Sequence, residues 1–130
     1  MLWLIRHALC DLYPSTDELP GIEQASLDEF LRRFRRETNR ATWAGVVLGA
    51  WAYTAAPILT VGMPAPSFLL SRRLRELHAE RMGSAPFYVV RQLTFVLKMV
   101  AGLCWGADPE VRARMNLPPL PGDPGTWRTE

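Results

Sequence analysis

One long stretch without charge constrains this chain more than any other feature. No charged residue occurs between Arg40 and Arg72, and residues 41–70 read ATWAGVVLGAWAYTAAPILTVGMPAPSFLL. A helix needs only about 20 apolar residues to cross a bilayer. The segment therefore predicts either a membrane span or a helix buried in protein. We expect burial, with part of the cover supplied by a partner chain.

Composition and charge favour an ordinary cytoplasmic domain. The chain has 130 residues, of which 48% are hydrophobic and 22% are charged, and its net charge of +2 is too small to indicate a polyanion partner. Cys10 and Cys104 are the only cysteines, which favours free thiols in a reducing compartment. No secretory or twin-arginine signal is readable at the start. We expect a cytoplasmic location, with membrane association left open.

Hydrophobic periodicity predicts an all-α fold with five to six helices. Leu27, Phe30, Leu31 and Phe34 form an i, i+3, i+4, i+7 stripe behind a Ser26–Glu29 capping box. No segment alternates convincingly as a strand. A helical domain is expected over residues 1–116 and an extended, proline-rich tail over 117–130. The expected helices are 2–13, 27–39, 41–59, 68–82, 85–106 and 108–115, with 41–59 and 85–106 as the central apolar pair.

Few residues point to chemistry in this chain. His7 and His78 each stand without a Cys, His or Glu at ligand spacing, so both are interpreted as structural or surface histidines. No haem-attachment motif, glycine-rich phosphate loop or serine elbow occurs in the sequence. A cysteine nucleophile would need a base brought close by the fold. We therefore expect no catalytic, cofactor-binding or metal-binding residue here.

The arginines of residues 32–40 are the best candidate for an anion-binding patch. Arg32, Arg33, Arg35, Arg36 and Arg40 would suit a nucleic acid or an anionic lipid. Acidic residues share the same helix, however, and no stacking aromatics interleave on that face. A solvated or partner-facing surface is favoured, and a nucleic-acid module is the weaker alternative.

The apolar content exceeds what a chain of this size covers readily. Two strongly apolar helices and five tryptophans have to be buried, and exposed apolar surface usually marks an interface. Gly45-x-x-x-Gly49 would allow close approach of a second helix, in lipid or in protein. The partner-interface candidates are Trp43, Gly45, Gly49, Trp51, Lys98, Trp105, Asp108, Pro109, Val111, Leu117, Pro118, Pro119 and Trp127.

Three blocks carry a family resemblance that spans most of the chain in order. The first is ALCDLYP at residues 8–14 followed by LPGIE at 19–23. The second runs from FLLSR at 68–72 through Leu77 to MGS at 82–84. The third and most specific is Leu97-Lys98, WGADPEV at 105–111 and MNLPP at 115–119. In these blocks the chain resembles the small accessory subunit of glucose–methanol–choline (GMC) oxidoreductases, the gluconate 2-dehydrogenase subunit 3-like group, and the N-terminal region of long-chain alcohol oxidases.

The resemblance implies a non-catalytic subunit. A large GMC partner would hold FAD and oxidise an alcohol, sugar or sterol hydroxyl, while this chain would cover an apolar face of it and shape substrate entry or membrane docking. Two departures stand out. Many members begin with a twin-arginine export signal, and no such signal is readable in this sequence. In addition, Asn116-Leu117 replaces the glycine–aromatic pair that is usual in the family.

A small integral membrane protein is the alternative, with a span at residues 42–63. Pro57 weakens this interpretation because it interrupts the helix. Arg91 and Lys98 weaken it further, since charges inside the second apolar helix spoil a hairpin of two spans.

Overall fold

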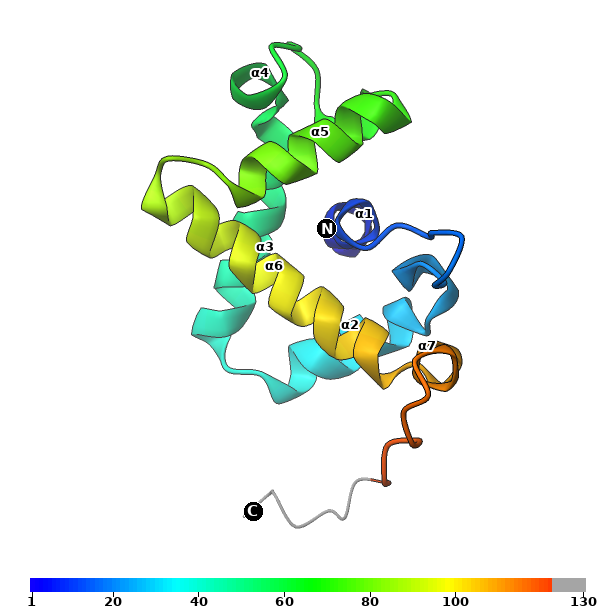
Figure 1. Ribbon diagram of the computed structural model, residues 1–130. Helices are drawn as coiled ribbons and strands as arrows, with labels where there is room; N and C mark the ends of the chain where they lie inside the picture. Colours follow the sequence, from blue (N-terminus) through cyan, green and yellow to red (C-terminus); the bar gives the residue numbers. More distant parts are fainter. Residues whose placement is uncertain (123–130) are drawn as a thin grey trace.

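The computed structural model describes residues 1–122 and has the expected all-α architecture (Figure 1). Seven α-helices and two short 3-10 turns account for the regular structure of this range, and no strand occurs in it. The elements are α1 (Leu2–Leu12), η1 (Ile22–Gln24), α2 (Leu27–Glu37), α3 (Arg40–Ala55), α4 (Pro57–Thr60), η2 (Ser67–Leu69), α5 (Arg72–Gly83), α6 (Tyr88–Ala107) and α7 (Pro109–Arg114).

The two most apolar helices, α3 and α6, form the central pair, as the sequence predicts. They make the most extensive contact of any two elements, and α1 packs against both of them and against α5 (Figure 1). The core gathers fully buried side chains from α1, α2, α3 and α6, including Ile5, Leu31, Tyr53 and Leu97.

Gly49 sets how closely α3 and α6 approach each other. A Cβ atom at this position would lie 3.1 Å from the Leu93 carbonyl oxygen and 3.1 Å from Leu97 Cγ. Both distances are shorter than ordinary van der Waals contact, so only glycine fits without a shift of one helix. At Gly45 the same construction meets only Val96 Cγ1, at 4.0 Å. Close packing therefore depends on one glycine of the predicted pair.

The helix expected over residues 41–59 is divided in two. Its start is capped by Asn39, whose side-chain oxygen accepts a hydrogen bond from the Thr42 amide at 2.7 Å. Its end comes at Ala55, because Pro57 cannot continue the hydrogen-bonding ladder and instead occupies the first turn of α4. The central helix is thus shorter than predicted.

Other boundaries also shift by a few residues. Helix α5 begins at Arg72, not at residue 68, because residues 67–69 form the turn η2. Helix α6 begins at Tyr88, not at residue 85, and Pro86 lies ahead of it. Ser26 occupies the N-cap of α2 but makes no side-chain capping bond, whereas the Asp108 side chain caps α7 by accepting from the amides of Glu110 and Val111.

The first part of the proline-rich segment is held against α7. The Leu117 amide donates to the Arg112 carbonyl at 2.8 Å, and Arg112 Nε donates to the Pro118 carbonyl at 2.7 Å. The last helix of the described range, α7, ends at Arg114, ahead of this segment. Trp127 lies outside the described residues.

Candidate interaction surfaces and a buried polar network

The outer side of α6 is an exposed apolar stripe. Tyr88, Phe95, Met99 and Leu103 recur at spacings of seven, four and four residues, which places them on one side of a helix. All four are exposed, and Phe95 keeps 60% of its surface accessible. The opposite side of the same helix, including Leu97 and Cys104, is buried in the core. We call these four residues the α6 face.

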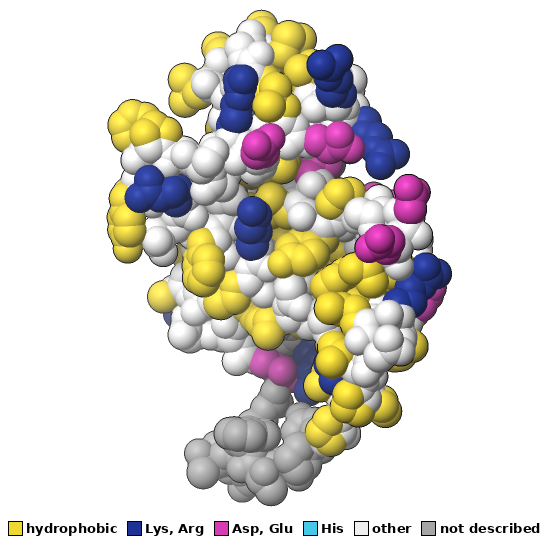
Figure 2. Space-filling model, in the orientation of Figure 1, with side chains coloured by type: hydrophobic (Ala, Val, Ile, Leu, Met, Phe, Trp, Pro, Cys, Tyr) yellow, Lys and Arg dark blue, Asp and Glu magenta, His cyan; other side chains and the backbone are white. Residues whose placement is uncertain are grey.

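More apolar surface continues the α6 face at the start of the helix. Phe87 and Val89 are both exposed beside Tyr88. Figure 2 looks onto α6 in front of α3 and shows apolar side chains along this side, with basic side chains beside them. Lys98 is exposed next to Met99 and supplies a cation at the edge of the stripe. A surface of this kind is more typical of an interface than of a free monomer.

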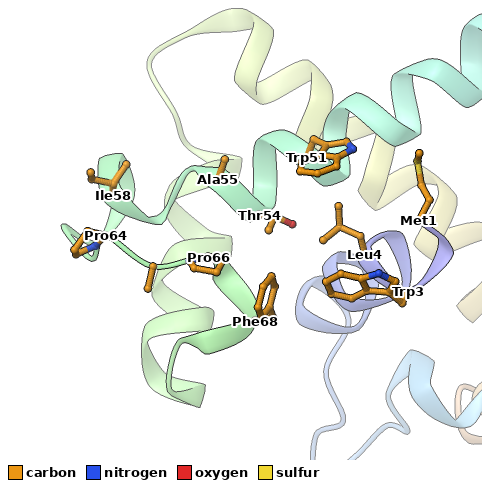
Figure 3. Close-up of a pocket in the computed structure, with 11 residues that line it drawn as sticks. Met1, Trp3, Leu4, Trp51, Thr54, Ala55, Ile58, Pro64, Pro66 and Phe68 are labelled. Atoms are coloured by element: carbon orange, nitrogen blue, oxygen red, sulfur yellow. The ribbon is translucent and has the colours of Figure 1, made fainter.

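A second apolar surface is a groove between the start of α1 and the end of α3 (Figure 3). Its cavity measures about 760 Å³, and its walls come from α1, α3, α4 and the loop that leads into η2. Trp3 and Phe68 form one side with their ring centroids 5.4 Å apart, in an edge-to-face arrangement. Trp51 and Ile58 contribute from α3 and α4. We call this surface the groove.

An arginine cluster lies beside the first turn of α1. Arg32, Arg35 and Arg36 line a surface depression together with Leu2 and Glu29. The Arg35 guanidinium also lies over the ring of Trp43, at 5.8 Å from the ring centroid. Trp43 therefore makes a cation–π contact inside the chain.

A buried polar network joins α1, α3 and α5 around one carboxylate. The Asp11 side chain is only 6% exposed, and its oxygens accept hydrogen bonds from Arg75 at 3.2 Å and from the Tyr53 hydroxyl at 3.4 Å. His7 Nε2 lies 3.2 Å from the same carboxylate. Burial raises the pKa of Asp11, although His7 and Arg75 oppose that rise. Burial also lowers the pKa of His7.

His78 extends this network into the core. The side chain is fully buried, with Nε2 2.8 Å from the Tyr53 carbonyl and Nδ1 2.5 Å from the Thr60 hydroxyl. A neutral ring that carries its proton on Nε2 satisfies both contacts, because Nε2–H donates to the carbonyl and Nδ1 accepts from the hydroxyl. Burial lowers the pKa of His78, which favours the neutral form. The histidine thus ties α5 to α3 and α4.

The network does not have the geometry of a catalytic triad. His7 Nε2 contacts both the Asp11 carboxylate and the Ser67 hydroxyl, each at 3.2 Å. A serine triad requires the acid and the nucleophile on different ring nitrogens, and it requires an accessible nucleophile. Ser67 is fully buried. We interpret the network as structural.

The histidines are therefore structural but not isolated, which corrects the sequence interpretation. The pairing of His7 with Asp11 follows from their i,i+4 spacing on one helix, a local signal that the sequence carries. The contact of His78 with Tyr53 depends on tertiary packing and has no local pattern.

Both cysteines are free thiols. Burial is the main cause that raises the pKa of each to about 11. A thiol with so high a pKa is a poor nucleophile at neutral pH. Among residues 1–122, no group of three His, Cys, Asp or Glu side chains is placed to hold a metal ion.

Several predicted interface residues are used inside the chain, which corrects their assignment. Gly49 and Val111 are buried and so cannot contact a partner directly. Trp105 Nε1 donates to the Pro20 carbonyl at 2.8 Å. Asp108 is occupied as the N-cap of α7. Gly49 and Val111 therefore serve the packing of the domain, whereas Trp105 and Asp108 are half-buried and stay interface candidates.

The other predicted positions are more open to a partner. Trp51 lies in the groove and Lys98 beside the α6 face. The remaining candidates of the described range that are exposed are Pro109, Leu117, Pro118 and Pro119, and Gly45 is half-buried. The sequence did not single out the α6 face itself, although its spacing was readable.

The segment 42–63 does not form one continuous helix, since α3 has 16 residues and α4 has four. Within residues 1–122, α6 is the one helix with the length and apolar composition of a membrane span. Its inner side packs in the core of the domain, a situation that a soluble core helix shares.

Comparison with known proteins gives no relative for this chain. No family model, no curated protein and no solved structure matches it.

Proposed function

We propose that this protein is a non-catalytic accessory subunit that binds and stabilises a larger enzyme through the α6 face. The observation that carries the proposal is the exposed stripe of Tyr88, Phe95, Met99 and Leu103 on the longest helix. A helix that presents apolar side chains along one side is suited to lie against a partner.

The nature of the partner follows from the family resemblance. A large GMC flavoprotein that holds FAD and oxidises an alcohol, sugar or sterol hydroxyl is the proposed partner. The most specific block of that resemblance begins at Leu97 and Lys98 in α6 and continues through α7. It thus includes part of the helix that carries the α6 face. FAD belongs to the partner in this proposal, and this chain contributes no group to the reaction.

Co-expression tests the proposal directly. The chain is produced with a GMC flavoprotein encoded beside its gene, and we expect a yellow complex that elutes as one species in size-exclusion chromatography. Replacing Phe95 and Met99 by serine should abolish co-elution, because it removes the centre of the stripe. Leu59→Ser is the matched control, since Leu59 is 87% exposed but lies in α4, outside the α6 face.

Two results would contradict the proposal. One is a stable, monodisperse monomer that does not bind the flavoprotein at micromolar concentration. The other is retention of the chain alone in carbonate-washed membranes, which would favour the integral membrane alternative with α6 as its span.

A further inference from the structure

The exposed side of the charge-free stretch is unusual for a surface that faces water. Residues 41–71 carry no charge, yet seven large apolar side chains of this stretch are exposed. These are Leu48, Trp51, Ile58, Leu59, Met63, Phe68 and Leu69. Three of them, Trp51, Ile58 and Phe68, line the groove (Figure 3). A surface of this composition requires a cover that is itself apolar.

The aromatic residues at the groove suit the boundary of a bilayer. Trp3 and Trp51 are 58% and 56% exposed, and both line the cavity. Tryptophan is enriched at membrane–water interfaces, where its ring spans the apolar and polar regions. Two half-exposed tryptophans at the mouth of one apolar groove fit such a boundary.

Positive charge borders the groove on the side of α2. Arg32, Arg35 and Arg36 form no ion pair with any residue of the range 1–122. Glu29 is the acidic residue that shares their depression. The arginine cluster adjoins the groove at the start of α1, where neighbouring residues belong to the two surfaces. Leu2 lies among the arginines, and Met1 lines the groove.

A further cation lies near α4, the helix whose Ile58 lines the groove. Arg81 of α5 donates a hydrogen bond to the Thr60 carbonyl at the end of α4, which fixes its guanidinium beside the exposed Ile58 and Leu59 segment. Arginines therefore lie near the α1 side and near the α4 side of the groove.

From this arrangement we infer that the groove docks onto the anionic surface of a lipid bilayer. Apolar and tryptophan side chains around Trp51 enter the headgroup region, and the arginines contact lipid phosphates. A nucleic acid would use the arginines but not the apolar centre. The α6 face has two cations along one edge, Arg91 and Lys98, but Arg91 is bonded to the carbonyls of Ala85 and Pro86 and the face has no arginine cluster. The inference uses a different surface from the proposed enzyme contact and does not depend on it.

Vesicle binding by the full chain tests this inference. The purified protein is sedimented with vesicles of phosphatidylcholine alone and with vesicles that also contain phosphatidylglycerol. We expect binding to the anionic vesicles that weakens as salt is raised, because screening reduces the arginine contribution. Lipids with brominated chains should quench tryptophan fluorescence, since Trp3 and Trp51 are placed at the interface.

Arginine variants and a tryptophan variant separate the electrostatic contribution to vesicle binding from the apolar one. Each arginine close to an anionic surface changes the partition coefficient by about fivefold, so Arg32→Gln with Arg36→Gln should weaken binding by about 25-fold. Trp51→Ala should reduce both binding and quenching. Lys98→Gln and Phe95→Ser are the matched controls on α6 and should leave both unchanged. Circular dichroism checks that every variant is folded.

Several outcomes would overturn the inference. Equal binding to neutral and anionic vesicles, or no binding to either, would do so. Loss of binding in the α6 controls but not in the groove variants would move the membrane contact to α6. If Trp51→Ala leaves vesicle binding intact and abolishes binding to the flavoprotein, the groove is a protein interface. If a DNA duplex competes fully with vesicles and the Trp51 variant behaves as wild type, the arginines are a polyanion site.

Discussion

Replacing Gly49 by alanine should loosen the central helix pair, and Gly45 provides an internal control. The added methyl group at Gly49 would lie 3.1 Å from the Leu93 carbonyl oxygen, which belongs to the α6 backbone and cannot rotate away. Helix α6 would have to move by a few tenths of an ångström, and overpacking of this kind costs about 1–3 kcal/mol. The same substitution at Gly45 meets nothing closer than 4.0 Å.

Both substitutions share the gain in helix propensity, which is about 1 kcal/mol from glycine to alanine. The difference in the free energy of unfolding between Gly45→Ala and Gly49→Ala therefore isolates the steric cost. We expect Gly45→Ala to be more stable than the wild type and Gly49→Ala to be less stable than Gly45→Ala by about 1–3 kcal/mol.

Urea unfolding followed by circular dichroism measures this difference, with equal m-values as the check that both variants unfold in the same way. Thermal unfolding should separate the midpoints by about 4 °C for each kcal/mol. Equal stability of the two alanine variants would refute the close approach of α3 and α6 at Gly49.

Three further changes probe the network, a loop anchor and a thiol. The pKa values of His7 and His78 are lowered in the folded state, so unfolding takes up protons and the free energy of unfolding should fall as the pH drops from 7.5 to 5.5. The raised pKa of Asp11 has the opposite effect on stability at lower pH. Urea unfolding midpoints measured across this pH range give the sign of the change. Trp105→Phe removes a hydrogen bond to a loop carbonyl and should cost about 1 kcal/mol, read from the same urea titration, while an unchanged midpoint would mean that the bond contributes nothing. Cys104, buried and with a pKa near 11, should react with a thiol reagent at pH 7.5 only as the protein unfolds, and rapid labelling of the native protein would contradict its burial.

Much of the fold was predictable because its helices carry local signals. The stripe behind Ser26, the Asp108-Pro109 start of α7 and the two apolar helices all rest on side-chain spacing or capping chemistry. What local reasoning could not supply is the exact end of each helix. Pro57 was expected to kink or shorten the central helix, but the sequence could not decide whether the chain would bend or restart, as it does in α4.

The interaction surfaces were less predictable, and the reason is geometric. The apolar excess of the sequence indicated that some hydrophobic surface would stay exposed, but an all-round apolar helix gives no sign of which side faces outward. Burial of Gly49 and Val111 depends on partners far away in the sequence, so both were wrongly placed at an external interface. Exposure of Phe95 follows only once α6 has its inner side fixed against α3.

The two apolar surfaces lead to a final prediction, that they act independently. Gly49 of α3 faces α6, while the α3 residues Trp51 and Ala55 line the groove, and the α6 face points away from that packing contact. Sites without shared contacts contribute additively to free energies, within about 0.5 kcal/mol. Phe95→Ser should therefore weaken enzyme binding without changing vesicle binding, and Trp51→Ala should do the reverse.

A double variant should then lose both activities, each by the amount found in the single variant. Measuring flavoprotein affinity in the presence and absence of anionic vesicles extends the test, because independent faces allow both partners to bind at once. If vesicles displace the flavoprotein, the two surfaces form one continuous interface, and the separation of an enzyme-binding side from a lipid-binding side is wrong. If both bind together, the domain is able to hold a soluble enzyme against a membrane, which neither surface could do alone.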